Sequence, residues 1–185
     1  MRGVSIKGCR GIVRRTVRAK RPGTTSPPPA SNIATTSVTA GTDGIILRYF
    51  ARSFAQRNAL VHAWCALPNH YHALIETTVV LEVLADLGRM HGRLSFDWNG
   101  EEQTRGRQVW CGAVERYMRN DRHFWATINY VHNNPVHHGY VQRWQEWPYS
   151  SASEYLAQMG HSEAARIWKE YPILGYGKGW DDPDL

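Results

Sequence analysis

A short apolar run and a second strand-like segment, separated by a turn signal, form the most regular pattern in the chain. They cover residues 59–66 and 70–77, and Pro68-Asn69 lies between them. Runs of this length on either side of such a pair predict a tight β-hairpin. Because strand side chains alternate between the two faces of a sheet, His70 and His72 are predicted to point the same way, and Tyr71 the opposite way.

Three segments carry apolar residues at helical spacing. The first covers residues 42–57, with Thr or Asp as its N-cap, and the second covers about 81–94. The third begins near residue 120 and ends around 134, because Pro135 disfavours helical geometry at the residue before it. The predicted buried positions, in chain order, are Ile46, Leu47, Phe50 and Phe54, then Leu81, Leu84, Leu87 and Met90, then Phe124, Ile128 and Val131.

Two further strands and a loop complete the pattern. Residues 32–40 are rich in Thr and Val and are the predicted first strand, and residues 108–118 form a last strand after a polar loop at 95–108. The resulting order is strand, helix, strand, strand, helix, strand, which is typical of a split βαβ arrangement. The sequence therefore predicts an α+β, ferredoxin-like antiparallel sheet with helices packed on one face.

The remaining residues divide into an arm and a tail. Residues 1–31 join a basic stretch to a Pro/Ser/Thr-rich one that cannot bury enough surface to fold, so we expect a disordered arm. This arm is either a tail that contacts phosphate groups or a segment upstream of the true start. Residues 32–160 are predicted as one domain, which includes a short helix at about 151–159, and residues 161–185 as a C-terminal tail.

Charge and cysteine content indicate a cytoplasmic protein with a polyanionic partner. The 185-residue chain has a formal net charge of +6, which favours nucleic acid as that partner. Cys9, Cys65 and Cys111 are odd in number and lack CxxC spacing, so we expect reduced thiols. No apolar run approaches the roughly twenty residues needed to span a bilayer, and no membrane partner is expected.

The histidine pair is the first candidate for chemistry. Two imidazoles on one strand face begin a metal site, although His-x-His triplets also arise by chance and two ligands do not make a site. The predicted third helix carries Tyr130 and Asn134 on a common face with Thr127. If this helix packs on the histidine face, Asn134 offers a third ligand and Tyr130 a hydroxyl beside a bound phosphate. From spacing alone, Tyr130 can equally be an ordinary aromatic of an amphipathic helix.

Three motifs resemble one protein family. His70-Tyr71-His72 resembles the HUH motif (histidine, hydrophobe, histidine) of single-tyrosine transposases and relaxases. The segment 129–139 resembles the Tyr-Ile-x-x-Asn-Pro-Val-x-x-Gly segment of REP-associated tyrosine transposases, and residues 147–151, Trp-Pro-Tyr-Ser-Ser, resemble the Trp-Pro-x-Ser-Ser element that follows it. The motifs occur in the family's order and cover residues 45–155.

The resemblance implies an enzyme that cleaves and rejoins single-stranded hairpin DNA of REP-like repeats. Its HUH strand and tyrosine helix would place His70, His72 and Asn134 around a divalent metal ion, Mg or Mn. Tyr130 would attack the DNA and leave a 5′-phosphotyrosine and a free 3′-hydroxyl. Magnesium normally takes oxygen ligands and imidazole suits Mn or Zn better, so the metal rests on the resemblance alone. Both a monomer and a homodimer remain open.

The chain departs from the family pattern in two places. Residues 1–44 do not match the family's first strand, and the acidic residue followed by His before the tyrosine helix is here Glu115-Arg116. Arg116 is a candidate phosphate contact at that position. The other basic candidates for DNA contact are Arg119, Arg122, His123, His137, His138 and Arg143, and the candidates for base stacking are Trp110, Trp125 and Trp144. The alternative for the basic residues is a solvated surface, and for the tryptophans it is the core.

Three functions are consistent with these observations. The first is the metal-dependent DNA transesterase with a tyrosine nucleophile. The second is a domesticated, catalytically inactive protein that binds hairpin DNA and needs no metal. The third, a metal-dependent hydrolase of a small substrate, lacks a carboxylate base in either motif. Because all four presumed catalytic residues are present, the sequence favours the transesterase.

Overall fold

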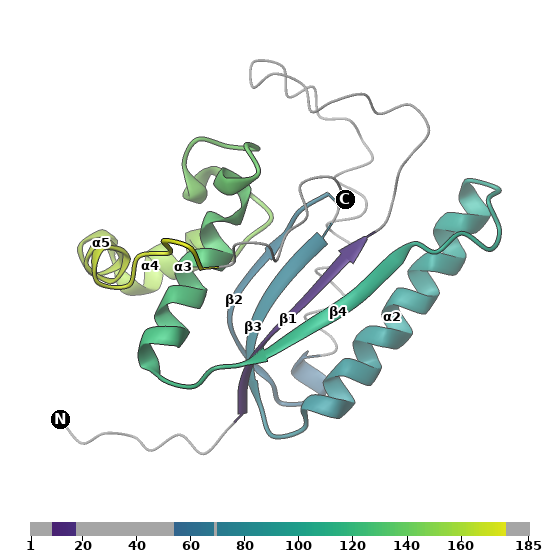
Figure 1. Cartoon of the computed structure of the whole chain (residues 1–185), viewed down its shortest axis with the longest axis horizontal. Helices are drawn as coiled ribbons and strands as arrows, with labels where there is room; N and C mark the ends of the chain where they lie inside the picture. The colour runs from purple at the N-terminus through teal and green to yellow at the C-terminus, as the bar shows by residue number, and fades with distance from the viewer. Residues whose placement is uncertain (1–8, 18–53, 69, 177–185) are drawn as a thin grey trace.

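The computed structural model describes the backbone of residues 9–17, 54–68 and 70–176, and their side chains except those of residues 9–17 and 111–116. Its elements are, in chain order, β1 (Cys9–Val17), β2 (Leu60–Ala66), β3 (His70–Thr77), α2 (Val80–Glu101), β4 (Trp110–Tyr117), α3 (Asp121–His137), η1 (Trp144–Glu146), α4 (Ala152–Met159) and α5 (His161–Glu170). The four strands form one antiparallel sheet in the order β2-β3-β1-β4 (Figure 1). This order is that of a ferredoxin-like sheet, so the predicted fold class is confirmed.

Strand β1 corrects the prediction of a disordered arm over residues 1–31. Residues 9–17 of that arm form a strand that pairs with β3 on one side and β4 on the other. The segment contains Ile, Val and Thr, which favour strands, and two neighbouring strands satisfy its backbone groups. The strand predicted at 32–40 lies outside the described residues, as does most of the helix predicted at 42–57, of which residues 54–56 are helical.

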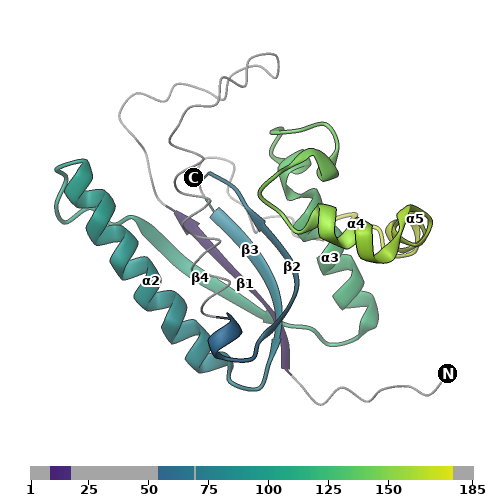
Figure 2. The same cartoon turned by 180° about the vertical axis from the view of Figure 1, so that it is seen from behind.

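Helices cover both faces of the sheet, whereas the sequence predicted helices on one face. Tyr71, Ala73 and Ile75 of β3 pack in one apolar cluster with α2. Leu74 packs in a second cluster with residues of α3. Figures 1 and 2 accordingly show α2 on one side of the sheet and α3, α4 and α5 on the other. The difference follows from the sequence of β3, in which nearly every side chain is buried, so both faces of the strand must be covered.

Helix α2 is longer than predicted and shows a shifted buried stripe. It continues to Glu101, through half of the segment that we predicted as a loop at 95–108. Trp98 extends the apolar stripe by one turn, and Arg93 pairs with Asp97 at 3.1 Å on the outer side. The buried residues are Val83, Leu87, Met90, His91 and Leu94, whereas Leu81, which we predicted as buried, is 76% exposed. In the described part of the chain, no helix combines the length and apolar character needed to cross a membrane.

Helix α3 continues past Pro135, where the sequence predicted its end. Pro135 lies in the last turn, and the helix closes only after His137. Gly139 has a φ of +72°, and its N–H donates to the carbonyl of Val136, while the N–H of Tyr140 donates to the carbonyl of Pro135. These two bonds form a Schellman motif, in which a left-handed glycine ends the helix. The predicted core positions of this helix, Phe124, Ile128 and Val131, are all buried.

The Trp-Pro-Tyr-Ser-Ser segment covers the outer edge of strand β2. The indole N–H of Trp147 donates to the carbonyl of Ala66 at 2.8 Å, and the N–H of Ala66 donates to the carbonyl of Tyr149 at 2.9 Å. The backbone N–H of Trp64 donates to the hydroxyl of Ser151 at 2.9 Å. These bonds occupy backbone groups that an edge strand would otherwise expose, so this motif has a structural role.

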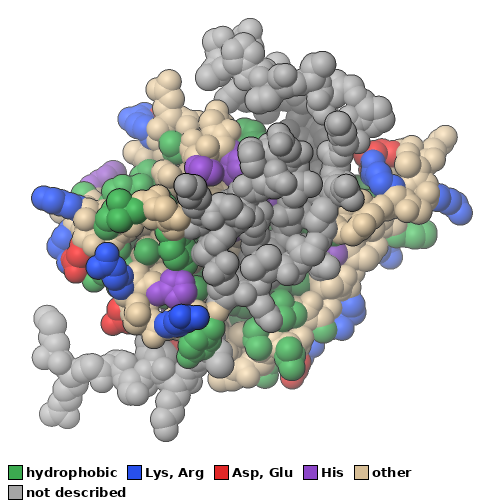
Figure 3. Space-filling model, in the orientation of Figure 1, with side chains coloured by type: hydrophobic (Ala, Val, Ile, Leu, Met, Phe, Trp, Pro, Cys, Tyr) green, Lys and Arg blue, Asp and Glu red, His purple; other side chains and the backbone are tan. Residues whose placement is uncertain are grey.

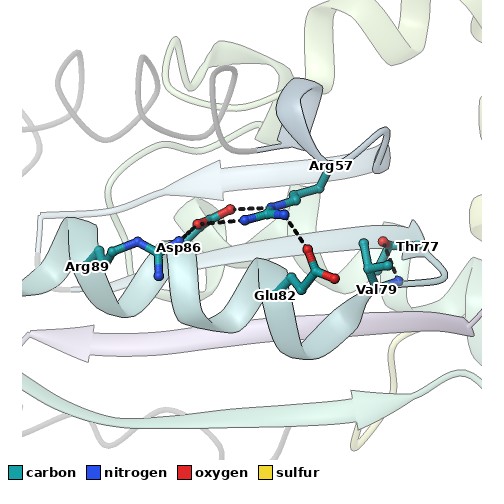
Figure 4. A network of polar contacts seen from close by, with 6 residues as sticks. All are labelled: Arg57, Thr77, Val79, Glu82, Asp86 and Arg89. Carbon is teal, nitrogen blue, oxygen red and sulfur yellow. Dashed lines mark hydrogen bonds and ion pairs between the residues drawn. The ribbon is translucent and has the colours of Figure 1, made fainter.

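A polar network joins the turn before β2 to helix α2 (Figure 4). The Nε–H of Arg57 donates to Asp86 at 2.7 Å, and a second guanidinium nitrogen of Arg57 pairs with Glu82. Arg89, one turn along the helix, also pairs with Asp86. Asp86 is the least exposed member of the network, with a side chain 11% exposed. The network therefore holds the turn that precedes the β2–β3 hairpin against helix α2.

Removal of the Asp86 carboxylate is expected to destabilise the fold. Asp86→Ala leaves two guanidinium groups without their shared acceptor, and we expect the free energy of unfolding to fall by about 1–2 kcal/mol. The matched control is Asp97→Ala on the same helix, whose carboxylate is 38% exposed and pairs with Arg93 alone. We expect that variant to lose less than about 0.5 kcal/mol. Urea unfolding followed by circular dichroism measures both, and equal losses would contradict this account.

Candidate active site

His70 and His72 form the centre of the candidate site. They begin strand β3 directly after the hairpin turn, which the N–H of Leu67 closes by donating to the carbonyl of His70 at 2.8 Å. Strand alternation places both rings on the α3 side of the sheet, with centroids 5.0 Å apart and planes at 87°. Their residues are 3% and 0% exposed. The predicted pair of imidazoles on one face is therefore present, and it is buried.

Helix α3 brings Tyr130 and Asn134 onto this pair. Asn134 Oδ1 lies 3.0 Å from His70 Nε2, and the Tyr130 ring lies 5.3 Å from the His72 ring, centroid to centroid. The two helix residues are four apart and so project from one face, which also carries the buried Thr127. The structure thus brings together the four side chains that the sequence placed on a remote strand and helix.

A third imidazole, that of His138, adjoins the pair. Its ring centroid lies 4.9 Å from that of His70. His138 follows Asn134 by four residues, and its N–H donates to the Asn134 carbonyl, so it continues the face that carries Tyr130. The sequence predicted His138 only as a residue that contacts DNA. The same four-residue spacing would have placed it at the site.

The ring of Tyr176 covers the candidate nucleophile. It packs against the Tyr130 ring with centroids 5.6 Å apart, and its hydroxyl hydrogen-bonds to the hydroxyl of Thr127. Tyr130 is only 5% exposed as a result of its packing. Nothing in the sequence indicated this contact, because Tyr176 follows an irregular segment beyond α5.

The donor set at the site is neutral and mixed. No three His, Cys, Asp or Glu side chains in the described residues are grouped so that they could hold a metal ion. A cation here would therefore rely on the two strand imidazoles and on the amide oxygen of Asn134. The 3.0 Å between the donor atoms of His70 and Asn134 is a hydrogen-bond distance.

The predicted DNA-contacting residues are divided between the two ends of α3 and strand β4. Arg119 and Arg122 are exposed there, next to the N-cap Asn120, which accepts the N–H of His123 at 2.8 Å. The His123 ring accepts the N–H of Arg119, and Arg143 forms an ion pair with Glu146 near the other end of the helix. Arg116 lies on β4, and its side chain is outside the described residues. Blue Lys and Arg side chains appear at both margins of the described surface (Figure 3).

The three tryptophans proposed for base stacking all pack within the protein. Trp110 is 6% exposed in the cluster under α2. Trp125 packs against Phe124, and Trp144 is stacked on the His132 ring on one side and on Trp168 on the other. The core alternative therefore describes Trp110, which is buried, and Trp125, which packs against the cluster around α3, while Trp144 is half-buried between two rings.

His132 is a structural neighbour of the site. It lies on α3 between Tyr130 and Asn134 but points toward η1 and α4, where its Nε2 lies 2.9 Å from the Ser151 hydroxyl. The residue is 1% exposed. Burial disfavours the charged imidazolium and lowers the pKa of His132 to about 4. His132 is therefore neutral at pH 7 and links α3 to the Ser-Ser element on the edge of β2.

Comparison with known proteins returns one kind of relative. No family model matches the chain. A Haemophilus influenzae protein described as a REP-associated tyrosine transposase, an assignment that is itself provisional, is 28% identical over 99 residues. That alignment covers 48% of this chain and 56% of the relative, so the chain matches little more than half of the relative's length.

A solved structure gives the same result for the fold. The structure of a REP-associated tyrosine transposase bound to a REP hairpin superposes with a TM-score of 0.59, covers 85% of each chain and is 18% identical in sequence. At this identity the match establishes the fold. The Haemophilus influenzae relative carries the description that the three motifs indicated, and the solved structure supports the fold.

The buried His132 predicts a pH dependence of stability. Because its folded pKa lies below its ordinary value of 6.5, the unfolded chain takes up a proton first as the pH falls. The stabilisation is therefore complete above pH 6.5 and is lost toward pH 4, amounting to about 2 kcal/mol between pH 7 and pH 5. His132→Gln should remove this component, whereas the exposed His161→Gln should retain it. Urea unfolding at the two pH values measures it, and parallel losses in all three proteins would contradict the assignment.

Proposed function

We propose that this chain is a REP-associated tyrosine transposase that binds hairpin DNA of REP-like repeats and cleaves an adjoining single strand. The observation that supports this most directly is the meeting of Tyr130 and Asn134 with the two histidines of β3. Burying several polar side chains between a helix and a sheet costs folding free energy. Proteins accept such a cost mainly at functional sites. We also expect the protein to act in the cytoplasm, where its DNA substrate is found.

In this proposal, His70, His72 and Asn134 would hold a divalent metal ion, Mg or Mn. When bound, the ion polarises a phosphoryl oxygen of the DNA and offsets the charge that develops in the transition state. All three ligands are neutral, so they leave the charge of the ion available to the phosphate. Two imidazoles suit Mn better than Mg.

Tyr130 is the proposed nucleophile. Its hydroxyl oxygen attacks the phosphorus of a DNA phosphodiester and releases its proton to solvent, while the bond from phosphorus to the 3′-oxygen breaks and that oxygen takes up a proton from solvent. The products are a 5′-phosphotyrosine and a free 3′-hydroxyl, and attack by a 3′-hydroxyl reverses the step and rejoins the strand. Since Tyr130 is buried under Tyr176, the DNA strand must displace the Tyr176 ring before it reaches the phenol.

The surface around the site supplies the proposed DNA contacts. Arg119 and Arg122 are exposed at the N-terminal end of α3, where the helix dipole also favours an anion. Arg116, His123 and Arg143 remain further candidates. Contacts of this kind position the strand through its phosphates and carry no sequence information directly.

Replacement of Tyr130 tests the nucleophile. Tyr130→Phe removes only the hydroxyl, so we expect hairpin-DNA binding to persist and the covalent protein–DNA adduct to disappear. The assay incubates labelled hairpin DNA carrying a single-stranded flank with protein and Mn²⁺ and resolves the adduct on a denaturing gel. Tyr117→Phe is the matched control, because that tyrosine is 60% exposed on β4, away from the site, and should leave adduct formation unchanged. An adduct in Tyr130→Phe, or none in the wild type, would refute the proposal, and binding without any adduct would leave an inactive hairpin-binding protein.

Replacement of Asn134 tests the metal site. We expect Asn134→Ala to weaken Mn²⁺ binding by at least about tenfold, because even outer-sphere partners of metal ligands contribute that much. Asn133→Ala, one residue earlier and half-buried, is the control and should bind Mn²⁺ as the wild type does. Titration calorimetry measures both affinities without DNA. Equal affinities in the two variants would remove Asn134 from the ligand set.

A further inference from the structure

The C-terminal end of helix α3 contacts the ring of His70 twice. Asn134 Oδ1 lies 3.0 Å from the His70 Nε2 nitrogen, and the His138 ring packs against the His70 ring with centroids 4.9 Å apart and planes at 66°. The His72 ring adjoins the same ring from within the strand, with centroids 5.0 Å apart. His70 therefore has three described neighbours around its imidazole, and two of them come from one helix end.

The backbone at the end of α3 determines where the His138 ring lies. His138 is the C-cap of the helix, and its N–H donates to the carbonyl of Asn134 at 3.0 Å. The left-handed Gly139 follows at once and ends the helix. Asn134 and His138 are four residues apart, so their side chains project from the same face. The helix end thus presents an amide oxygen and an aromatic ring to one imidazole.

Ring contacts continue from His138 to the edge of the sheet. The centroid of the His138 ring lies 6.3 Å from that of Tyr140, and the Tyr140 ring lies 5.4 Å from that of Trp147. These separations fall in the range of about 4.5–7 Å at which aromatic rings attract each other. The indole N–H of Trp147 donates to the carbonyl of Ala66 at 2.8 Å, which fixes the last ring to strand β2. His70 is therefore linked to the edge strand through packed side chains as well as through the sheet.

The geometry separates His138 from the proposed ligands themselves. Within the described residues no three His, Cys, Asp or Glu side chains are placed to hold a metal ion together, and this includes the set of His70, His72 and His138. The Nε2 atom of His138 is shielded from solvent, which does not suit a surface contact with DNA. The ring contact with His70 is thus the observed interaction through which His138 can act on the site. Metal-binding imidazoles depend on neighbours that hold their rings in orientation.

We propose that His138 is a positioning residue, which holds the His70 imidazole in the orientation in which its Nε2 faces Asn134, with Tyr140 packed behind it. A histidine side chain rotates about two single bonds, and a ring on one side together with an oxygen at the nitrogen restricts both rotations. A ring that is already restricted loses less conformational entropy when it binds an ion, so the ion binds more tightly. The consequence for the metal rests on the proposed function, whereas the restriction of the ring does not.

The test compares His138→Ala, which removes the ring, with His138→Phe, which keeps a ring but has no nitrogen atoms. Motion of the His70 ring is measured in the metal-free full-length protein by NMR relaxation of its ring carbons, and Mn²⁺ affinity is measured by titration calorimetry. We expect His138→Ala to increase the ring motion and to weaken Mn²⁺ binding by about tenfold, and His138→Phe to restore the wild-type values of both. The control is His137→Ala, which removes the adjacent exposed imidazole and should match the wild type.

Two results would overturn the inference. The first is a His70 ring that moves no more in His138→Ala than in the wild type. The second is an equal loss of Mn²⁺ affinity in His138→Ala and His138→Phe, because a nitrogen atom of His138, and not its ring, would then be what the ion requires.

A further variant covers the case in which His138→Ala does not fold. Tyr140→Leu keeps His138 and all the proposed ligands but removes the ring behind them, so we expect a smaller increase in His70 ring motion and Mn²⁺ binding weakened by about threefold. Ring motion at the wild-type level in Tyr140→Leu would overturn the inference in that case. A wild type that binds no Mn²⁺ refutes the metal site of the proposed function instead, and the ring motion then still decides whether His138 positions His70.

Discussion

The contact between helix α3 and the histidine face of strand β3 is the constraint on which the rest of the structure depends. That face carries two imidazoles followed by Leu74. Exposing it to water would leave apolar surface uncovered, and covering it with a wholly apolar helix would leave the imidazole nitrogens without hydrogen-bond partners. Helix α3 meets both requirements, because Ile128 packs in the cluster around Leu74 while the Asn134 oxygen reaches His70. The same packing brings the Tyr130 phenol against His72.

The chain fixes α3 at both ends and along its outer side. Asn120 caps its first turn, and the left-handed Gly139 closes its last one. On the outer side, His132 reaches the Ser151 hydroxyl, which in turn accepts the N–H of Trp64 on β2. The Trp-Pro-Tyr-Ser-Ser motif therefore acts on the site from a distance. It joins the helix to the edge strand through these bonds.

The sequence predicted those parts of the molecule that local patterns determine. Alternation along residues 70–77 placed His70 and His72 on one face, and four-residue spacing placed Tyr130 with Asn134. The strand at 9–17 escaped prediction because its basic residues resemble a disordered arm, and only pairing with two neighbours stabilises it. The Tyr176 contact and the second helical layer depend on tertiary packing, for which no local pattern gives a signal. Pro135 did not end the helix where the sequence predicted, because α3 continues for two residues beyond it to His137.

A site built from neutral ligands has a consequence for how its partners bind. With His70, His72 and Asn134 as donors, a divalent cation would enter a buried place without any compensating charge, which is costly in a medium of low dielectric constant. A DNA phosphate supplies part of that charge, so each of the two ligands lowers the cost of binding the other. Such coupling is reciprocal by thermodynamic necessity. Under the proposed function, the metal ion and the strand therefore bind as a pair, and the ion is held most firmly when a phosphate is in place to be cut.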